Sequence, residues 1–265
     1  MERQLVRLCL HNMWNIQTFD ELPSTQILAR ERFYLGYGKH GDVFIAQHQT
    51  SGKGRYENRI WHDEGGMSLL MSIILTEIPP YLQNKMQFVA ALSVLSTIRN
   101  LLRHEIRDFA AERIQLKWPN DILADGRKIS GILTESIWSG ETLKGMIIGI
   151  GININQDHFS GEISQRAIAL KHILKFSSSI ERVRDLFLAT LEDSLAHYSL
   201  PDVLLHDLRR ELEWMRKIEN FSLTESNGTK REGLRYDGIT DDGVLKVILP
   251  DNSKQTHQNA TLIFQ

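Results

Sequence analysis

The stretch IQLKWPNDILADGRKISGILTESI, residues 114–137, predicts a β-hairpin at the centre of the fold. Asp125-Gly126 stands between two apolar runs, and this dipeptide is typical of a two-residue turn in which both residues need positive φ. Such a turn sets the register of the two strands, and the expected pairs are Leu123–Lys128, Asp121–Ser130 and Lys117–Thr134. Side-chain alternation then places Lys117, Asp121 and Lys128 on one face of the hairpin.

Two lysines and a carboxylate on one strand face indicate a ligand site, because burying charge is costly unless the charges are paired or functional. Pro119 cannot donate to a strand ladder, so we expect an edge or a bulge there, which turns Asn120 toward the same face. A solvated hairpin with an incidental lysine–aspartate pair is the alternative, and spacing alone does not decide between the two.

Composition indicates one large domain and one small one, since 265 residues can bury a full core. The formal net charge of −2 provides no general electrostatic attraction for nucleic acid. Cys9 is the single cysteine, which excludes an internal disulfide and a cysteine zinc cluster and indicates a reducing compartment. The N-terminal residues do not read as a secretory signal, and the longest apolar run, residues 67–75, is too short to span a membrane. We therefore expect a cytoplasmic protein without membrane association.

The first half of the chain alternates strand and helix patterns. We expect strands at 13–20, 42–46 and 67–76, a helix from Ser24 to about Leu35, and an amphipathic helix at 84–109. Ser24 or Thr25 is suited to cap the first helix, and capping is the structural interpretation of both residues. A helix N-terminus also offers free amides to an anion, so capping and ligand binding are compatible.

The loop after the second strand contains Gly52-Lys53-Gly54-Arg55, in which glycines alternate with basic residues. Glycines let backbone amides approach a phosphate closely, and the basic side chains neutralise it. The same composition is typical of a flexible solvated loop. The motif is not the dinucleotide-binding fingerprint, because the third glycine is missing and a strand follows where a helix should begin.

In the second half, a strand at 143–155 carries Gly149 and Gly151 at alternate positions, which leaves room on one face for another backbone or a flat ligand beside Asn153. Helices are expected at about 163–175, 180–198 and 201–217, the second opened by the capping-box pattern Ser178-x-x-Glu181. From residue 219, short strand patterns between turn signals predict a small β-barrel. The expected fold is α+β, with a mixed β-sheet and packed helices in residues 1–218 and a small β domain in 219–265.

Five motifs together resemble the biotin protein ligases in order and approximate spacing: Ser24-Thr25, Gln49-x-x-Gly52-x-Gly54-Arg55, Lys117-Trp-Pro-Asn-Asp121, Lys128-x-x-Gly131-Ile-Leu and Gly149-x-Gly151-Ile-Asn153. The resemblance covers nearly the whole chain. It implies a catalytic domain like that of the class II aminoacyl-tRNA synthetases, followed by an SH3-like β-barrel.

The resemblance also implies a two-step acyl transfer that uses biotin, ATP and Mg²⁺. The biotin carboxylate attacks the α-phosphate of ATP to give biotinyl-5'-AMP and diphosphate, and a lysine of a biotin carboxyl carrier protein or domain then accepts the biotin. An anion must approach a polyanion in the first step, so the site needs preorganised positive charge and Mg²⁺ rather than a covalent nucleophile. The resemblance leaves a homodimer open.

Residue roles are implied by position in the family motifs. Catalysis is implied for Lys128 and Arg55, and no metal ligand is assigned. Biotin binding is implied for Ser24, Thr25, Gln26, Gln49, Lys53, Gly54 and Gly131. Binding of ATP or the adenylate is implied for Gly52, Arg55, Lys117, Asn120, Asp121 and Asn153.

The chain departs from the family pattern in the loop at residues 52–61, at Gln26 and in the length of the segment before Phe19. Lys53 stands where an arginine is usual, Tyr56-Glu57 replaces a step that ends in glycine, and Gln26 replaces an asparagine. Eighteen residues precede Phe19, so we expect no helix-turn-helix domain and no DNA binding. The alternatives are a lipoate-type protein ligase, which shares the mechanism but is expected to lack Lys-Trp-Pro-Asn-Asp, and a non-catalytic binding module.

Overall fold

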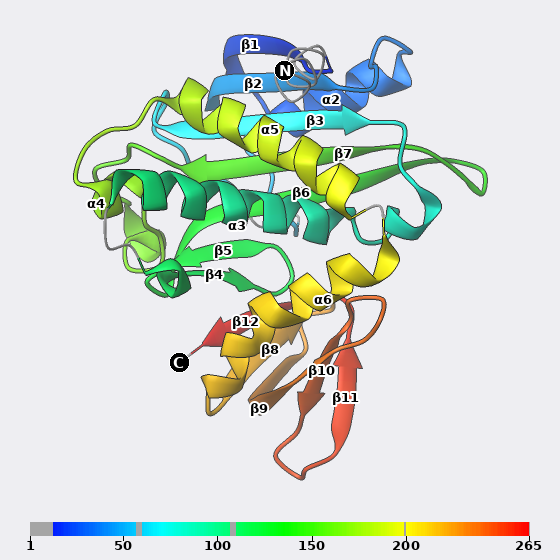
Figure 1. Ribbon diagram of the computed structural model, residues 1–265, viewed down its shortest axis with the longest axis vertical. Helices are drawn as coiled ribbons and strands as arrows, with labels where there is room; N and C mark the ends of the chain where they lie inside the picture. The colour runs from blue at the N-terminus through cyan, green and yellow to red at the C-terminus, as the bar shows by residue number, and fades with distance from the viewer. Residues whose placement is uncertain (1–12, 57–59, 107–109, 199, 265) are drawn as a thin grey trace, which may run out of the picture.

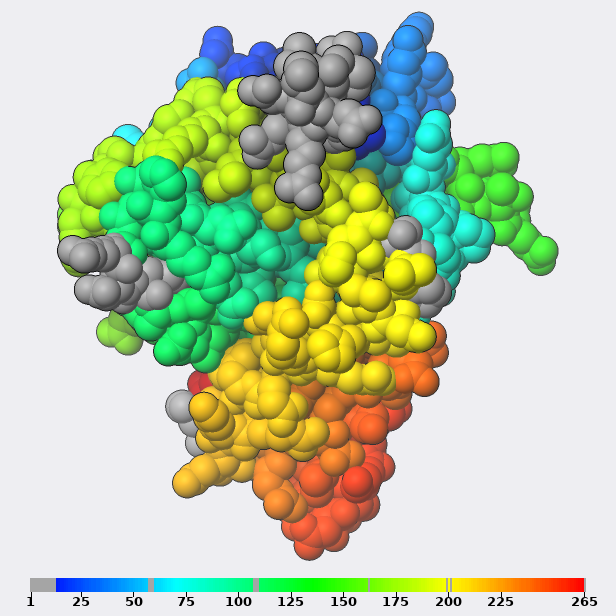
Figure 2. Space-filling model, viewed as in Figure 1, coloured from blue at the N-terminus to red at the C-terminus, as the bar shows by residue number. Residues whose placement is uncertain are grey.

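The computed structural model describes residues 13–56, 60–106, 110–198 and 200–264. Three positions discussed above, Cys9, Glu57 and the end of the helix expected at 84–109, lie outside these residues. A large body contains the central sheet and most of the helices, and a small sheet projects below it as a narrower lobe (Figures 1 and 2). Within the described residues, no helix has the length and apolar character needed to cross a membrane.

The central sheet has seven strands in the order β1-β2-β3-β7-β6-β5-β4. β1 and β2 are parallel and every other pair is antiparallel, so the expected mixed sheet is confirmed. The strands are β1 (Asn15–Leu22), β2 (Asp42–Gln49), β3 (Ser68–Leu75), β4 (Ile114–Lys117), β5 (Asp121–Ala124), β6 (Arg127–Ser139) and β7 (Thr142–Asn153).

Helices cover both faces of this sheet (Figure 1). The α-helices are α2 (Thr25–Tyr34), α3 (Met86–Glu105), α4 (Leu170–Leu174), α5 (Ile180–His197) and α6 (Pro201–Leu212). Short 3₁₀ helices are η1 (Pro80–Leu82), η2 (Ala111–Arg113), η3 (Gly161–Ile163) and η4 (Glu213–Lys217). α3 and α5 share one apolar core with one face of the sheet, whereas Ala29 of α2 packs with Phe44, Ile74 and Ile147, which alternation places on the opposite face.

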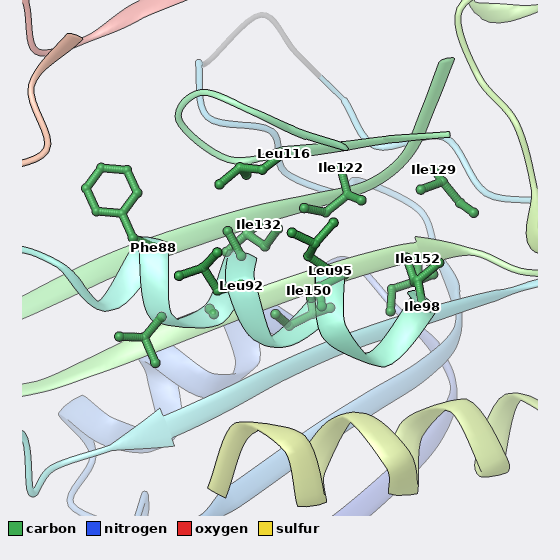
Figure 3. Close-up of a cluster of buried hydrophobic side chains, with 14 of the residues drawn as sticks. Phe88, Leu92, Leu95, Ile98, Leu116, Ile122, Ile129, Ile132, Ile150 and Ile152 are labelled. Carbon is green, nitrogen blue, oxygen red and sulfur yellow. The ribbon is translucent and has the colours of Figure 1, made fainter. Parts of the chain in front are cut away.

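The amphipathic period of α3 builds the main core. Phe88, Leu92, Leu95 and Ile98 project from one side of the helix onto the sheet. Figure 3 shows them against apolar side chains of β4 to β7. The facing residues are Leu116, Ile122, Ile129, Ile132, Ile150 and Ile152, and all are buried. Burial of large apolar side chains is the main stabilising term in such a layer, so the expected scaffold role of this helix is confirmed.

The helix expected at 163–175 is wrong for most of its length, since α4 covers Leu170–Leu174. Before α4, residues 164–166 form a turn after η3, and Ala167 forms an isolated bridge with Lys128 at the start of β6. The Lys128 N–H donates to the Arg166 carbonyl (2.7 Å), and the Ile168 N–H donates to the Lys128 carbonyl (3.0 Å). The cap of α5 is also shifted, because Ser179 rather than Ser178 accepts the N–H of Arg182.

The central hairpin has the predicted turn but not the full predicted register. Asp125 and Gly126 have φ of 49° and 75°, and Leu123 pairs with Lys128. An irregularity between Ile122 and Leu123 then places Asp121 opposite Gly131 instead of Ser130.

Lys117 is likewise not opposite Thr134, because residues 118–120 form a turn and Lys117 pairs with Asp121 across β4 and β5. Pro119 therefore lies in this turn and not within a strand, and the Trp118–Pro119 peptide bond is cis.

The C-terminal lobe is a five-stranded antiparallel sheet in the order β11-β10-β9-β8-β12. Its strands are β8 (Phe221–Glu225), β9 (Lys230–Ile239), β10 (Leu245–Ile248), β11 (Lys254–His257) and β12 (Ala260–Phe264). The expected closed barrel is not confirmed, because no pairing joins β11 to β12 among the described strands. The free edge of β12 faces the large body instead, where Arg55 donates to the Ala260 carbonyl.

Two indole groups fix the lobe to the large body. Trp118 Nε1 donates to the Gly243 carbonyl (2.9 Å), and Trp214 Nε1 of η4 donates to the Leu116 carbonyl (2.9 Å). Gly243 packs so tightly on Phe88 that a Cβ atom there would lie 2.3 Å from the ring. The C-terminal sheet is therefore docked on the same hairpin that carries the predicted site.

Candidate functional site

A cavity of about 60 Å³ lies on the α2 side of the central sheet. The N-terminus of α2, the loop after β2, and strands β3, β6 and β7 form its walls. Ten of the residues expected at the site from the sequence line this one cavity: Ser24, Thr25, Gln26, Gln49, Lys53, Gly54, Arg55, Asn120, Lys128 and Gly131.

The N-terminus of α2 supplies a polar wall. Ser24 is the N-cap, and its hydroxyl accepts the N–H of Gln26 (3.2 Å). The Thr25 N–H donates to Gln49 Oε1 at 2.7 Å, and the Thr25 hydroxyl lies 3.1 Å from the same oxygen. Because Gln49 Oε1 accepts the Thr25 N–H, the amide has a fixed orientation, and its Nε2 group remains available as a donor at the cavity.

Behind this wall lies a second hydrogen-bonded layer on β3 and β7. Ser72 Oγ is 2.8 Å from Thr25 Oγ1 and 3.0 Å from Gln26 Oε1, and Ser72 is fully buried. Gln26 Nε2 in turn donates to the Ile147 carbonyl at 3.4 Å. The polar wall is thus tied to the backbone of the central sheet.

The alternating glycines make room for side chains from the surrounding segments. A Cβ on Gly151 would lie 2.7 Å from the Trp61 ring, and a Cβ on Gly149 would lie 2.6 Å from Gln26 Oε1. A Cβ on Gly131 would come within 3.0 Å of both Lys128 and Trp61. The side-chain-free face therefore lies under the Trp61 indole and the Gln26 amide.

Positive charge gathers at one end of the cavity. Lys128 Nζ lies 2.6 Å from Asp121 Oδ1 and 5.5 Å from the Trp61 ring centroid. Burial raises the pKa of the Asp121 carboxyl. The positive charges of Lys128, Lys117 and Arg55 lower this pKa by more than burial raises it, so the pKa lies below its usual value. Asp121 is therefore ionised at neutral pH and is compensated by three cations.

Arg55 connects the loop after β2 with both the hairpin and the C-terminal sheet. Its Nη1 donates to Asn120 Oδ1 (3.4 Å), and its Nη2 donates to Tyr56 Oη (2.9 Å) and to the Ala260 carbonyl. Lys117 lies nearby on β4, with Nζ 5.4 Å from the Phe264 ring centroid. β12 thus contacts two of the cations expected to bind phosphate.

Four of the predicted site residues do not line the cavity. Asp121 and Lys117 lie next to its charged end. Gly52 is buried under Trp61, and the Gly52 carbonyl accepts the backbone N–H of Trp61 (3.0 Å). Asn153 is buried at the end of β7, where its Nδ2 donates to the Ile168 carbonyl (3.2 Å).

The sequence reasoning missed Trp61 and Ser72 as parts of the site. Trp61 follows the loop after β2, and nothing local in the sequence shows that it folds back onto Gly131 and Gly151. Ser72 could have been noticed as a hydroxyl inside the otherwise apolar stretch SLLMSIIL of β3. A buried polar group in such a run needs a hydrogen-bond partner, which points to a network.

Comparisons with known proteins identify the relatives of this chain. The model of the biotin/lipoate A/B protein ligase family matches residues 18–153. The bifunctional ligase/repressor BirA of Bacillus spizizenii is 31% identical over 253 residues, which cover 90% of this chain and 70% of that protein. A biotin ligase of acetyl-CoA carboxylase from Mycobacterium tuberculosis is 31% identical over 118 residues, which cover 44% of this chain and 40% of that protein. Among solved structures, the biotin protein ligase from Aquifex aeolicus in complex with biotin and ATP has a TM-score of 0.75 at 24% identity, covering 95% of this chain and 99% of that one.

Proposed function

Because this chain belongs to the biotin/lipoate A/B protein ligase family, we propose that it activates biotin with ATP as biotinyl-5'-AMP and transfers the biotin to a lysine of a biotin carboxyl carrier protein or domain. The observation that carries this proposal is the composition of the cavity. One lining combines hydroxyl and amide groups suited to a small neutral ring with the two cations Lys128 and Arg55.

The biotin ring is assigned to the wall formed by Ser24, Thr25 and Gln49, with Trp61 over the glycine face. A cyclic urea carries one carbonyl acceptor and two N–H donors, and the hydroxyl and amide groups of this wall can satisfy both kinds. Gln26, Lys53, Gly54 and Gly131 complete the ring site in the proposal. The apolar ring atoms pack against the indole, which contributes both area and shape.

The first step takes place at the charged end. A carboxylate oxygen of biotin attacks the α-phosphorus of ATP, an O–P bond forms, and the bond to the leaving diphosphate breaks. Lys128 and Arg55 neutralise charge on the carboxylate and on the phosphate, so that two anions can approach each other in the right orientation. The ion pair with Asp121 keeps Lys128 in place before the substrates bind.

ATP and the adenylate are assigned to Gly52, Arg55, Lys117, Asn120, Asp121 and Asn153. Among the described residues, no group of three or more histidine, cysteine, aspartate or glutamate side chains could hold a metal ion. The donors present fit Mg²⁺ bound mainly by phosphate and water, with Asp121 as the adjacent carboxylate. When bound, Mg²⁺ supplies further neutralisation of phosphate charge.

The second step transfers biotin from the adenylate to the carrier. The uncharged lysine amine attacks the acyl carbonyl, a C–N bond forms, the acyl C–O bond breaks so that AMP leaves with its electron pair, and the amine proton passes to solvent. We propose a biotin carboxyl carrier domain as the partner, a division of the chain at residues 218 and 219, and a cytoplasmic location, which the single cysteine supports. The net charge of −2 supports the further proposal that the chain does not bind DNA, and a homodimer stays open.

The test is incubation of the protein with ATP and either biotin or lipoate, with detection of diphosphate, followed by addition of a carrier domain. We expect diphosphate release with biotin and labelling of one carrier lysine. Release with lipoate alone would favour the lipoate-type ligase, and release with neither substrate would favour a non-catalytic module.

A further inference from the structure

We infer that Ser72, a fully buried residue in the wall of the cavity, is a positioning residue that fixes the direction of the hydrogen bond made by the Thr25 hydroxyl in the ring-binding wall. This inference rests on the proposed function. It adds that Ser72 determines the pattern of donors and acceptors by which the wall prefers a urea-like ring. Ser72 is the link between Thr25 at the cavity and Gln26 behind it.

Both ends of the chain of hydrogen bonds are backbone groups with fixed roles. The Ile147 carbonyl can only accept, so the Gln26 amide must present Nε2 to it and Oε1 to Ser72. The Thr25 N–H can only donate, so Gln49 must present Oε1 to it at 2.7 Å. Neither amide can be reversed without placing two donors or two acceptors against each other.

Counting hydroxyl protons then fixes the middle of the chain. Ser72 and Thr25 have one hydroxyl proton each, and there are three contacts: Ser72 to Gln26, Ser72 to Thr25, and Thr25 to Gln49. Among the described residues, Ser72 is the donor found for Gln26 Oε1, whereas Gln49 Oε1 already receives a backbone N–H. The arrangement that leaves no buried acceptor unpaired therefore has Thr25 donating to Ser72, and Ser72 donating to Gln26.

This direction determines what the cavity offers to a ligand. The Thr25 proton points inward, so Thr25 Oγ1 has lone pairs available as an acceptor. Beside it, Gln49 presents Nε2 as a donor. An acceptor next to a donor complements an N–H next to a C=O, which is the pattern of a cyclic urea, whereas a disulfide ring such as that of lipoate has no N–H to offer.

Removing the buried Ser72 hydroxyl disrupts this direction while the side chains of Thr25 and Gln49 are kept. In Ser72→Ala, Gln26 Oε1 loses its donor, and the Thr25 proton has Gln49 Oε1 as its remaining close acceptor. The Thr25 hydroxyl is then no longer tied to β3. We expect biotin affinity to fall about tenfold, the scale of one well-formed hydrogen bond, and affinity for ATP to stay within about twofold.

Ser93→Ala is the matched control. Ser93 is also fully buried and also donates one hydrogen bond, from Oγ to the Val89 carbonyl (2.8 Å), but it lies within α3 on the other side of the sheet. It therefore reproduces the general cost of deleting a buried hydroxyl. Ser72→Cys is the conservative variant, since it keeps a donor of similar size, and it should recover part of the biotin affinity.

The experiment measures biotin binding by calorimetry and the KM values for biotin and ATP in wild type, Ser72→Ala, Ser72→Cys and Ser93→Ala. A rise in the biotin Kd and KM confined to Ser72→Ala, with unchanged KM for ATP, supports the inference. Equal biotin affinity in Ser72→Ala and wild type, or an equal rise in both KM values, would overturn it. If Ser72→Ala does not fold, Ser72→Cys decides the point by the same comparison.

Direct binding also separates this inference from the proposed function. If the wild type binds biotin but releases no diphosphate, the proposed reaction fails and the role of Ser72 is still measured. If the wild type binds no biotin, both are wrong.

Discussion

Lys128 and Asp121 form an ion pair across the β5–β6 hairpin, with Nζ 2.6 Å from Oδ1, at the charged end of the cavity. Lys128 is the cation expected to contact the reacting phosphate. Asp121 is the carboxylate that directly follows the 118–120 turn. Lysine side chains are flexible, and a paired lysine has less freedom to lose when the substrates bind. The ion pair is therefore part of the preorganisation of the site.

We predict that Lys128→Ala reduces biotin-dependent diphosphate release by about a hundredfold or more, the scale of losing one preorganised charge contact. The measurement is steady-state release of diphosphate at saturating biotin and ATP. Lys171→Ala is the control, because Lys171 also pairs with a carboxylate, Asp157 at 2.5 Å, but in a helix that does not line the cavity. Similar activity in both variants would remove Lys128 from the reaction.

Asp121→Asn tests the charge balance through stability. The folded pKa of Asp121 is lowered, so its contribution to the free energy of unfolding is present above the unfolded pKa of about 3.9 and is lost as pH falls through the folded value. A charge-assisted hydrogen bond contributes about 1.5–3 kcal/mol when buried, and exposure of Lys128 reduces this to about 1 kcal/mol. Urea unfolding at pH 7 should show this loss in Asp121→Asn.

The difference in free energy of unfolding between Asp121→Asn and wild type should shrink as pH falls below the unfolded pKa of about 3.9, and it should disappear once the pH lies below the folded pKa, where the wild-type carboxyl is protonated in both states. A difference that is unchanged across this range of pH would mean that the substitution acts through packing and not through charge.

Gly151→Ala should displace Trp61, because the added Cβ would lie 2.7 Å from the indole ring. We expect biotin affinity to fall about tenfold or more, together with a change in tryptophan fluorescence of the free protein. Adding Trp61→Leu to Gly151→Ala removes the ring that clashes. The double variant should then bind biotin no more weakly than Trp61→Leu alone, and a further loss would place the clash elsewhere.

Gly243→Ala should loosen the docking of the C-terminal sheet. The added Cβ would lie 2.3 Å from the Phe88 ring, and the positive φ of 78° adds backbone strain. Gly228→Ala is the matched control, because its φ is 85° but nothing lies within 4 Å of the new Cβ. We expect Gly243→Ala to unfold more easily than Gly228→Ala by about 1–3 kcal/mol in urea, and equal midpoints would show that Phe88 can move aside.

The local features that the sequence determined are those that depend on near neighbours in the chain. The Asp125-Gly126 turn, the cap at Ser24 and the apolar period of α3 each follow from steric or hydrogen-bonding preferences over a few residues. The ten predicted residues around the cavity were identified by the order of the family motifs, whereas the packing of distant strands brings them together.

Long-range contacts, by contrast, were decided by the tertiary structure. The irregularity at Ile122 shifts Asp121 opposite Gly131, and a bridge between Lys128 and Ala167 takes the place of the helix that was expected there. Arg55 donates to the Ala260 carbonyl 205 residues away, and β12 pairs with β8 but not with β11 among the described strands, so the sheet does not close into a barrel. A local pattern cannot encode these outcomes, because the partner that satisfies each buried hydrogen-bonding group is set only when distant segments pack together.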